Sequence, residues 1–180
     1  MRSAPPVLLA DEVHVLRLPS GDRDEASGAL RDVLAAYLET SPEAIRIVDG
    51  AHGKPELAGG ELHFNLSHSG DVGLVAVAAE REVGVDVERI DSRRDVVALA
   101  ERALGAEGAD AVRAAPEADR SAVFHRAWAR REAVAKCAGT GLSIPPPDAP
   151  RQVSDLDVGD GYAAALAVAG AAPVRVELRT

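Results

Sequence analysis

The sequence predicts an α+β fold in two halves, each with helix followed by strands. The helical signal is clearest in residues 22–39, where apolar residues recur at the spacing of one buried helix face. The strand signal comes from three short apolar stretches, 62–66, 72–79 and 82–88, which are separated by turn residues. The second half of the chain repeats the order of helix and then strands.

In the first half, residues 13–18 are expected to form the first strand. The helix over 22–39 should end at the sequence 40–42, Thr-Ser-Pro, and residues 45–48 can form a short strand. The next three strands should be joined by tight turns, of which Ser69-Gly70-Asp71 is the clearest.

In the second half, residues 93–104 should be helical, followed by a stretch rich in Gly and Ala over 105–117. A long helix is expected over 120–138, with Gly139 as its C-cap. The segment 144–150 contains four prolines and should be loop or extended chain, and strands are expected at 162–169 and 174–178.

Composition favours a compact cytoplasmic protein. The 180 residues are 47% apolar but include only five aromatic residues, so Ala, Val and Leu should build the core. The longest uncharged apolar run, 72–79, is too short to span a membrane, and the N-terminus lacks the pattern of a signal peptide. The single cysteine fits a reducing cytosol, and the net charge of −9 argues against nucleic acid as a partner.

Two short segments carry the candidate chemistry. In the expected strand Gly84–Glu88, side chains alternate between faces, so Asp86 and Glu88 should point the same way, about 6–7 Å apart. Two carboxylates that close repel unless a cation or solvent lies between them. In the long helix, Trp128, Glu132 and Lys136 are four residues apart and should share a face. Facing each other, these segments could bind a divalent metal and a phosphate, although each pattern also occurs on ordinary solvated surfaces.

A third segment contains Gly53-Lys54-Pro55 and, further on, Phe64-Asn65-Leu66-Ser67-His68-Ser69. Together with Gly84–Glu88, Trp128–Lys136 and Gly139-Thr140-Gly141-Leu142, this order of motifs resembles the 4′-phosphopantetheinyl transferases, most closely their Sfp-type, pseudo-dimeric branch. The resemblance covers about residues 12–169. It implies two pseudo-symmetric α+β subdomains, residues 1–90 and 91–180, with the active site at their interface.

The reaction implied by this resemblance moves the phosphopantetheine arm of coenzyme A onto a serine of an acyl or peptidyl carrier protein and releases 3′,5′-ADP. Asp86, Glu88 and Glu132 would then hold Mg²⁺, for which Mn²⁺ can substitute. Glu132 would accept the serine proton, directly or through a water, and Lys136 would hold the pyrophosphate. The catalytic set is thus Glu132, Lys136 and Asp86, in a monomeric enzyme of fatty-acid, polyketide or nonribosomal-peptide synthesis.

The resemblance also implies contacts to coenzyme A by Lys54, Ser67 and His68, besides Lys136. Relatives usually carry a longer basic segment between the first strand and the first helix, so Arg23 and Arg31 are the remaining candidates for the 3′-phosphate. The segment after Leu142 is also short, which predicts that a strand of the second half is missing or replaced by the proline loop.

Two alternatives stay open at this point. Another metal-dependent phosphoryl-transfer enzyme, such as a nuclease or phosphatase, could use the same three carboxylates. A non-catalytic relative could bind coenzyme A or a carrier protein. Carrier proteins are usually acidic around the modified serine, so an acidic enzyme needs a local basic patch to bind them, for which the arginines at 93, 94, 126, 130 and 131 are candidates, with Val96 and Val97 adding apolar contact.

Overall fold

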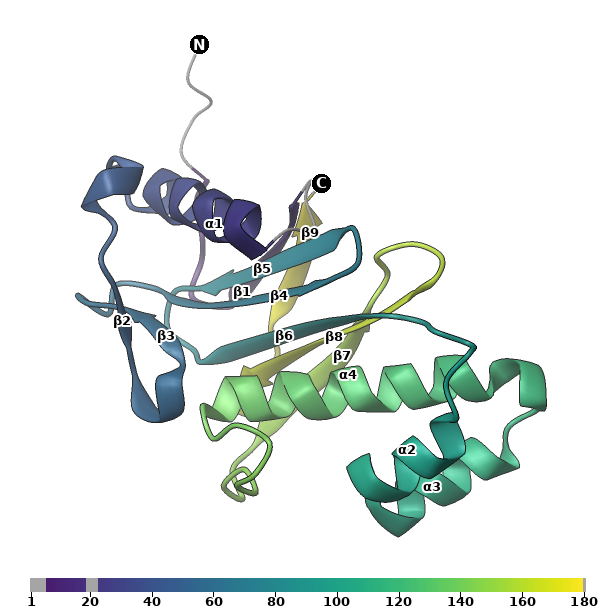
Figure 1. Ribbon diagram of the computed structural model, residues 1–180. Coiled ribbons are helices and arrows are strands. Elements are labelled where there is room, and N and C mark those ends of the chain that lie inside the picture. Colours follow the sequence, from purple (N-terminus) through teal and green to yellow (C-terminus); the bar gives the residue numbers. More distant parts are fainter. Residues whose placement is uncertain (1–5, 19–22, 180) are drawn as a thin grey trace.

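The computed structural model describes residues 6–18 and 23–179, and for residues 23–26 and 51 it describes the backbone alone. Figure 1 shows the arrangement of the elements. In chain order they are β1 (Glu12–Leu18), α1 (Arg23–Tyr37), β2 (Ile47–Asp49), β3 (Pro55–Leu57), β4 (His63–Ser69), β5 (Val72–Ala78), β6 (Val83–Arg89), α2 (Val96–Ala103), α3 (Gly105–Ala114), α4 (Arg120–Ala138), β7 (Arg151–Leu156), β8 (Tyr162–Ala169) and β9 (Arg175–Arg179). The fold is α+β, as predicted.

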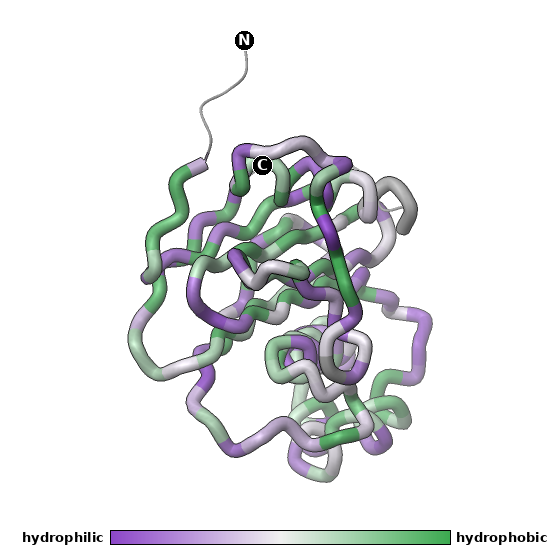
Figure 2. Tube along the Cα trace, turned by 90° about the vertical axis from the view of Figure 1, so that its left-hand side faces the viewer, coloured by the Kyte–Doolittle hydropathy of each residue, from purple (hydrophilic) through white to green (hydrophobic). Residues whose placement is uncertain are grey.

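Two main sheets form the centre of the molecule. The first has the strand order β4-β5-β1-β9 and the second β6-β8-β7, while β2 and β3 pair separately. Pairing is antiparallel except between β1 and β9, which run parallel. Hydrophilic and hydrophobic residues follow one another at short intervals along the chain in the upper half of Figure 2.

The core consists of layers of side chains on the faces of these sheets. Between the two sheets, valines and leucines of β1, β5, β6 and β8 pack together. On the other side of the first sheet, α1 covers Val75, Val77 and Phe64, and on the other side of the second sheet α4 packs through alanines and Cys137. β5 is therefore buried on both faces, which explains its continuous apolar sequence Val-Gly-Leu-Val-Ala-Val-Ala.

Helices α2 and α3 lie beside the first half of α4, away from the two sheets in Figure 1. Val96, Ala100, Val112 and Phe124 form their small core. Asp95 caps α2 by accepting a hydrogen bond from the backbone N–H of Ala98, which satisfies one of the free donors at the helix start. Within the described residues, no helix is long and apolar enough to cross a membrane.

Most predicted elements are confirmed, and two expectations were wrong. Residues 105–114, for which the sequence predicted no helix, form α3, because Ala109 and Val112 find an apolar surface on α2 and α4. A strand was expected to be missing after Leu142, but β7 is present at residues 151–156 and pairs with β8. Gly139 does cap α4, with a φ of 65° in the left-handed region that glycine tolerates.

The strand pairings cross the expected boundary between residues 90 and 91. β6 belongs to the first half of the sequence but pairs with β8 of the second half. β9, near the C-terminus, pairs with β1. Each sheet therefore contains chain from both halves, and the division into subdomains 1–90 and 91–180 stays a prediction.

Candidate active site

Strand β6 places two carboxylates on the side of the sheet that faces α4. Val83, Val85 and Val87 are buried in the core between the two sheets. Because side chains alternate along a strand, Asp86 and Glu88 point to the opposite face, as the sequence predicts. Asp86 is only 3% exposed, so it is a buried acid rather than one at a solvated edge.

Gly84, on the same face of β6, lets α4 approach unusually closely. A Cβ atom at this position would lie 2.1 Å from the carbonyl oxygen of Ala133 and 2.3 Å from the backbone nitrogen of Cys137. The strand and the helix are therefore in backbone contact, which brings the helix side chains directly over the carboxylates.

The face of α4 that carries Trp128, Glu132 and Lys136 is turned toward this strand. Lys136 Nζ donates to Asp86 Oδ1 at 2.6 Å, and Trp128 Nε1 donates to Glu88 Oε1 at 3.1 Å. The helix thus contacts Asp86 through Lys136 and Glu88 through Trp128. Glu132 lies between these two helix residues in the sequence. Lys136 thus meets Asp86, and the charges of Asp86 and Glu88 act on Glu132.

Burial raises the pKa of all three carboxyl groups, and repulsion between carboxylates adds to this effect for Glu88 and Glu132. For Asp86 the largest cause is burial, which outweighs the opposing effects of Lys136 and the hydroxyl of Ser67. Burial also raises the pKa of Glu88 and of Glu132, and the charge of Asp86 raises both further. Such a set of acids repels itself when ionised and is stabilised by a cation.

One buried oxygen of this set has no hydrogen-bond partner among the described residues. Asp86 Oδ1 accepts hydrogen bonds from Ser67 and Lys136, whereas Oδ2 is buried and finds no hydrogen-bond partner among the described residues. In the part of the chain that is described, no three His, Cys, Asp or Glu side chains stand close enough together to hold a metal ion. The charge and the unpartnered oxygen fit a divalent cation, and side-chain movements would have to complete its coordination.

A cleft of 640 Å³ opens over these groups. It is bounded by α1, β2, β3, β4, β6 and α4, so both halves of the sequence contribute to it. The predicted residues that line it are Arg31, Ser67, His68, Asp86, Glu88, Glu132 and Lys136. The His68 side chain is exposed, and Arg31 donates to the carbonyl of Ile45. Arg23 begins α1, but its side chain lies outside the described part of the structure.

Lys54 is placed differently from the other candidates. Its side chain is 8% exposed and forms an ion pair with Glu82, and its Nζ also donates to the carbonyl oxygens of Val83 (3.2 Å) and Cys137 (3.4 Å). The lysine connects the loop after β2 with the start of β6 and the end of α4. It is absent from the lining of the cleft, whereas its neighbour Pro55 is part of it.

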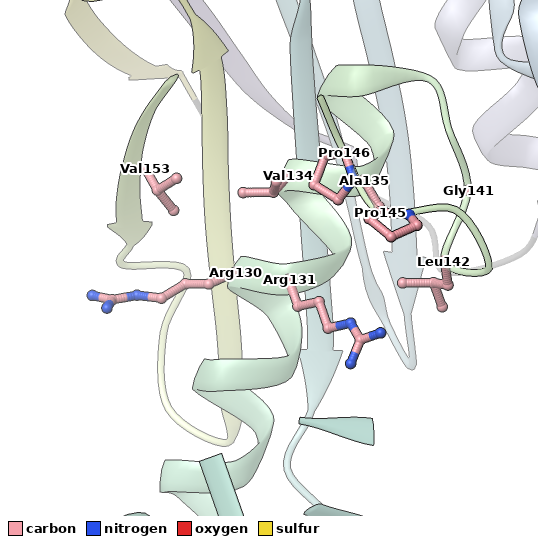
Figure 3. A pocket seen from close by; sticks show the side chains of 9 residues that line it. All are labelled: Arg130, Arg131, Val134, Ala135, Gly141, Leu142, Pro145, Pro146 and Val153. Carbon is pink, nitrogen blue, oxygen red and sulfur yellow. The ribbon is translucent and has the colours of Figure 1, made fainter. Parts of the chain in front are cut away.

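A second hollow, of 390 Å³, lies on another side of α4 (Figure 3). Helix side chains such as Arg130 and Val134, the loop residues Leu142 and Pro145, and Val153 of β7 surround it. It shares no lining residue with the cleft and contains no carboxylate. This hollow therefore lacks the carboxylates that could hold a metal ion, which the cleft has.

Three residues that shape the site were assigned no role from the sequence. Gly84 allows the close approach of α4, and Asn65 and Ser69 accept hydrogen bonds from backbone N–H groups of β6. A glycine within an apolar strand is a usable signal for close backbone approach. The alternation of Asn65, Ser67 and Ser69 shows that they share a face of the strand. Which element this face contacts is decided by the tertiary structure.

The comparison with known families agrees with this geometry. Residues 82–175 match the 4′-phosphopantetheinyl transferase superfamily, and the chain belongs to this superfamily. The matched segment contains β6 and α4, and hence Asp86, Glu88, Glu132 and Lys136.

Individual relatives extend the match. The chain is 33% identical over 120 residues to the 4′-phosphopantetheinyl transferase HetI of Nostoc sp., covering 64% of this chain and 51% of HetI. It is 38% identical over 127 residues to the 4′-phosphopantetheinyl transferase AcpT of Salmonella typhimurium, covering 69% of this chain and 64% of AcpT. AcpT of Escherichia coli is 39% identical over 123 residues, with coverage of 67% and 61%. The matched part thus spans about half of HetI and less than two thirds of AcpT.

Proposed function

We propose that this protein transfers the 4′-phosphopantetheine group of coenzyme A to a serine of an acyl or peptidyl carrier protein and releases 3′,5′-ADP. The observation that carries the proposal is the meeting of Asp86 and Glu88 from β6 with Glu132 and Lys136 from α4 in one cleft. These residues lie in the segment that matches the superfamily. The names of the relatives support the same reaction.

In this proposal Asp86, Glu88 and Glu132 hold Mg²⁺, or Mn²⁺ in its place. The ion, when bound, neutralises charge on the pyrophosphate of coenzyme A. The free Oδ2 of buried Asp86 supports this assignment, as do the raised pKa values of the three carboxyl groups.

The transfer itself forms a bond between the serine oxygen and the β-phosphorus and breaks the bond from that phosphorus to the oxygen that leaves with 3′,5′-ADP. Glu132 takes the serine proton, directly or through a water. The Lys136 ammonium offsets the negative charge that develops on the leaving group. Exposed His68 and Arg31 at the cleft wall are available for the phosphates of coenzyme A.

The test is incubation of the protein with coenzyme A, Mg²⁺ and an apo-carrier protein, followed by intact-mass measurement of the carrier. A mass gain equal to the phosphopantetheine arm supports the proposal, and Asp86→Ala should abolish most of it without unfolding the protein. Cleavage of coenzyme A without any mass gain on the carrier would indicate another phosphoryl-transfer enzyme. Binding of coenzyme A with no product would indicate a non-catalytic relative.

We further propose that this protein acts as a monomer and that the carrier docks beside the start of α2. Arg93 and Arg94 are 90% and 62% exposed, and the charge of Arg94 acts on Glu88 in the cleft. Arg93 and Arg94 pair with Asp91, just as Arg126 and Arg130 pair with Asp155, so ion pairing does not separate the two sets. The action of Arg94 on Glu88 is what favours the first set. The expectation that Val96 offers contact was wrong, since it is buried in the core of the α2–α3 pair.

Reversal of both arginines, Arg93→Glu with Arg94→Glu, should raise the KM for the carrier at low salt and leave the KM for coenzyme A nearly unchanged. The control reverses Arg102 and Arg113, which lie on α2 and α3, so that the net charge changes equally. An unchanged carrier KM in the first variant, or an equal rise in both, would place docking elsewhere.

A further inference from the structure

Strands β4 and β6 lie side by side at the edges of their two sheets, and side chains rather than backbone groups join them. Both strands are edge strands in the sheet order. The N–H groups of Val85, Val87 and Arg89 on β6 donate to Asn65 Oδ1 (2.9 Å), Ser67 Oγ (3.3 Å) and Ser69 Oγ (3.0 Å) on β4. Alternate side chains of β4 thus satisfy backbone donors that an additional strand would otherwise bind.

Ser67 differs from Asn65 and Ser69 because it also contacts charged side chains of the candidate active site. Its hydroxyl donates to Asp86 Oδ1 at 2.9 Å and accepts a hydrogen bond from Lys136 Nζ at 3.1 Å. A serine hydroxyl offers one donor and two acceptor positions. With Val87 N–H as the second donor, all of these positions are filled by the protein, and Ser67 is only 7% exposed.

From this saturation we infer that Ser67 is a positioning residue, which holds the Asp86 carboxylate and the Lys136 ammonium in one arrangement across β4, β6 and α4, rather than a ligand of coenzyme A. The inference rests on the proposed function and gives Ser67 a different role from the coenzyme A contact implied by the motif.

The physical consequence concerns the orientation of Asp86. The hydrogen bonds from Ser67 and Lys136 both end on Oδ1, and this fixes the rotation of the carboxylate. Oδ2 is thereby left as the oxygen without a partner, in a residue that lines the cleft. Loss of the hydroxyl would leave Asp86 held by the long, flexible side chain of Lys136 alone, and the carboxylate could rotate.

Ser67→Ala tests this role, and Ser69→Ala is the matched control. Both variants remove a hydroxyl of β4 that accepts a hydrogen bond from a β6 N–H, but only Ser67 also contacts Asp86 and Lys136. Ser67→Thr keeps a hydroxyl and serves as the rescue variant. The measurements are kcat and KM for coenzyme A in the carrier assay, calorimetric affinity for Mg²⁺ alone, and the temperature of unfolding.

We expect Ser67→Ala to lower kcat roughly tenfold or more, to weaken Mg²⁺ binding, and to change the KM for coenzyme A less than about threefold. Ser69→Ala should keep kcat and Mg²⁺ affinity, and Ser67→Thr should recover most of both. A raised KM for coenzyme A with kcat preserved would overturn the inference and make Ser67 a ligand of coenzyme A. Equal losses in the two alanine variants would overturn it too, because only the joining of the sheet edges would then matter.

The failure of the proposed function would be recognised separately. If the wild-type protein transfers nothing to a carrier, the function is refuted, and the Mg²⁺ affinities of the two alanine variants still decide whether Ser67 orients Asp86.

Discussion

Replacement of Gly84 by alanine tests whether backbone contact between β6 and α4 sets the geometry of the site. The added Cβ would lie 2.1 Å from Ala133 O, 2.3 Å from Cys137 N and 2.9 Å from Cys137 Cα, whereas ordinary contact begins at 3.4 Å. These are backbone atoms within a helix, so no side chain can rotate away. The helix must therefore move from the strand by roughly 1 Å.

This movement should cost both stability and activity. The interface consists of Ala129, Ala133 and Cys137 against Ala165 and Ala167, small residues that leave little room for repacking. We expect the free energy of unfolding to fall by about 1–3 kcal/mol, the usual cost of overpacking a core. Because the helix carries Glu132 and Lys136, kcat in the carrier assay should fall by roughly 10- to 100-fold.

Gly28→Ala provides the control for Gly84→Ala. Gly28 lies in α1 and is exposed, and a Cβ added there would have no other atom within 4 Å among its non-local neighbours. Alanine there should stabilise the protein by about 0.5–1 kcal/mol and leave kcat unchanged. Denaturant unfolding and the intact-mass assay measure both quantities. Wild-type stability and kcat in Gly84→Ala would refute the argument that this contact positions the helix.

The remaining predictions concern charged side chains. Burial and the charge of Asp86 raise the pKa of Glu132, so the folded state favours its neutral form, and the metal-free protein should lose stability as pH rises through that value. In the presence of a chelator, Glu132→Gln should lose less stability than the wild type as the pH rises above the usual range of a glutamate carboxyl; an equal loss would contradict the assignment. Lys136→Ala should lower kcat/KM by a factor that corresponds to about 2–4 kcal/mol of transition-state free energy. A mild effect would indicate that Lys136 only forms a structural ion pair. Lys54→Met should lower the unfolding free energy by about 1–3 kcal/mol, because it breaks the contact with Glu82, and leave the KM for coenzyme A unchanged; the reverse result would support a coenzyme A contact.

Local sequence patterns were sufficient to identify the chemical groups of the site. Alternation along a strand places Asp86 and Glu88 on one face, and four-residue spacing on a helix places Glu132 and Lys136 on another. Both patterns follow from the geometry of a single element, so they need no knowledge of the fold. The positions of α1, α4 and most strands were predictable for the same reason.

Structures that depend on distant partners were not predictable in this way. Helix α3 forms because its apolar residues pack against α2 and α4, and β7 forms because β8 offers it an edge. The motif containing Lys54 suggested a nucleotide contact, but its ammonium group is held by Glu82 and two backbone carbonyls. Burial and pairing of that kind are set by residues far away in the sequence.

The sequence by itself determined which residues are candidates for phosphoryl transfer, because residue type and the period of each element are local properties. The tertiary structure alone decided how those residues are held. Ser67 meets Asp86 and Lys136 only because the edges of two sheets come together, and Gly84 matters only because α4 crosses it. Hydrogen bonds and steric contacts act over a few ångströms in space, whatever the separation along the chain.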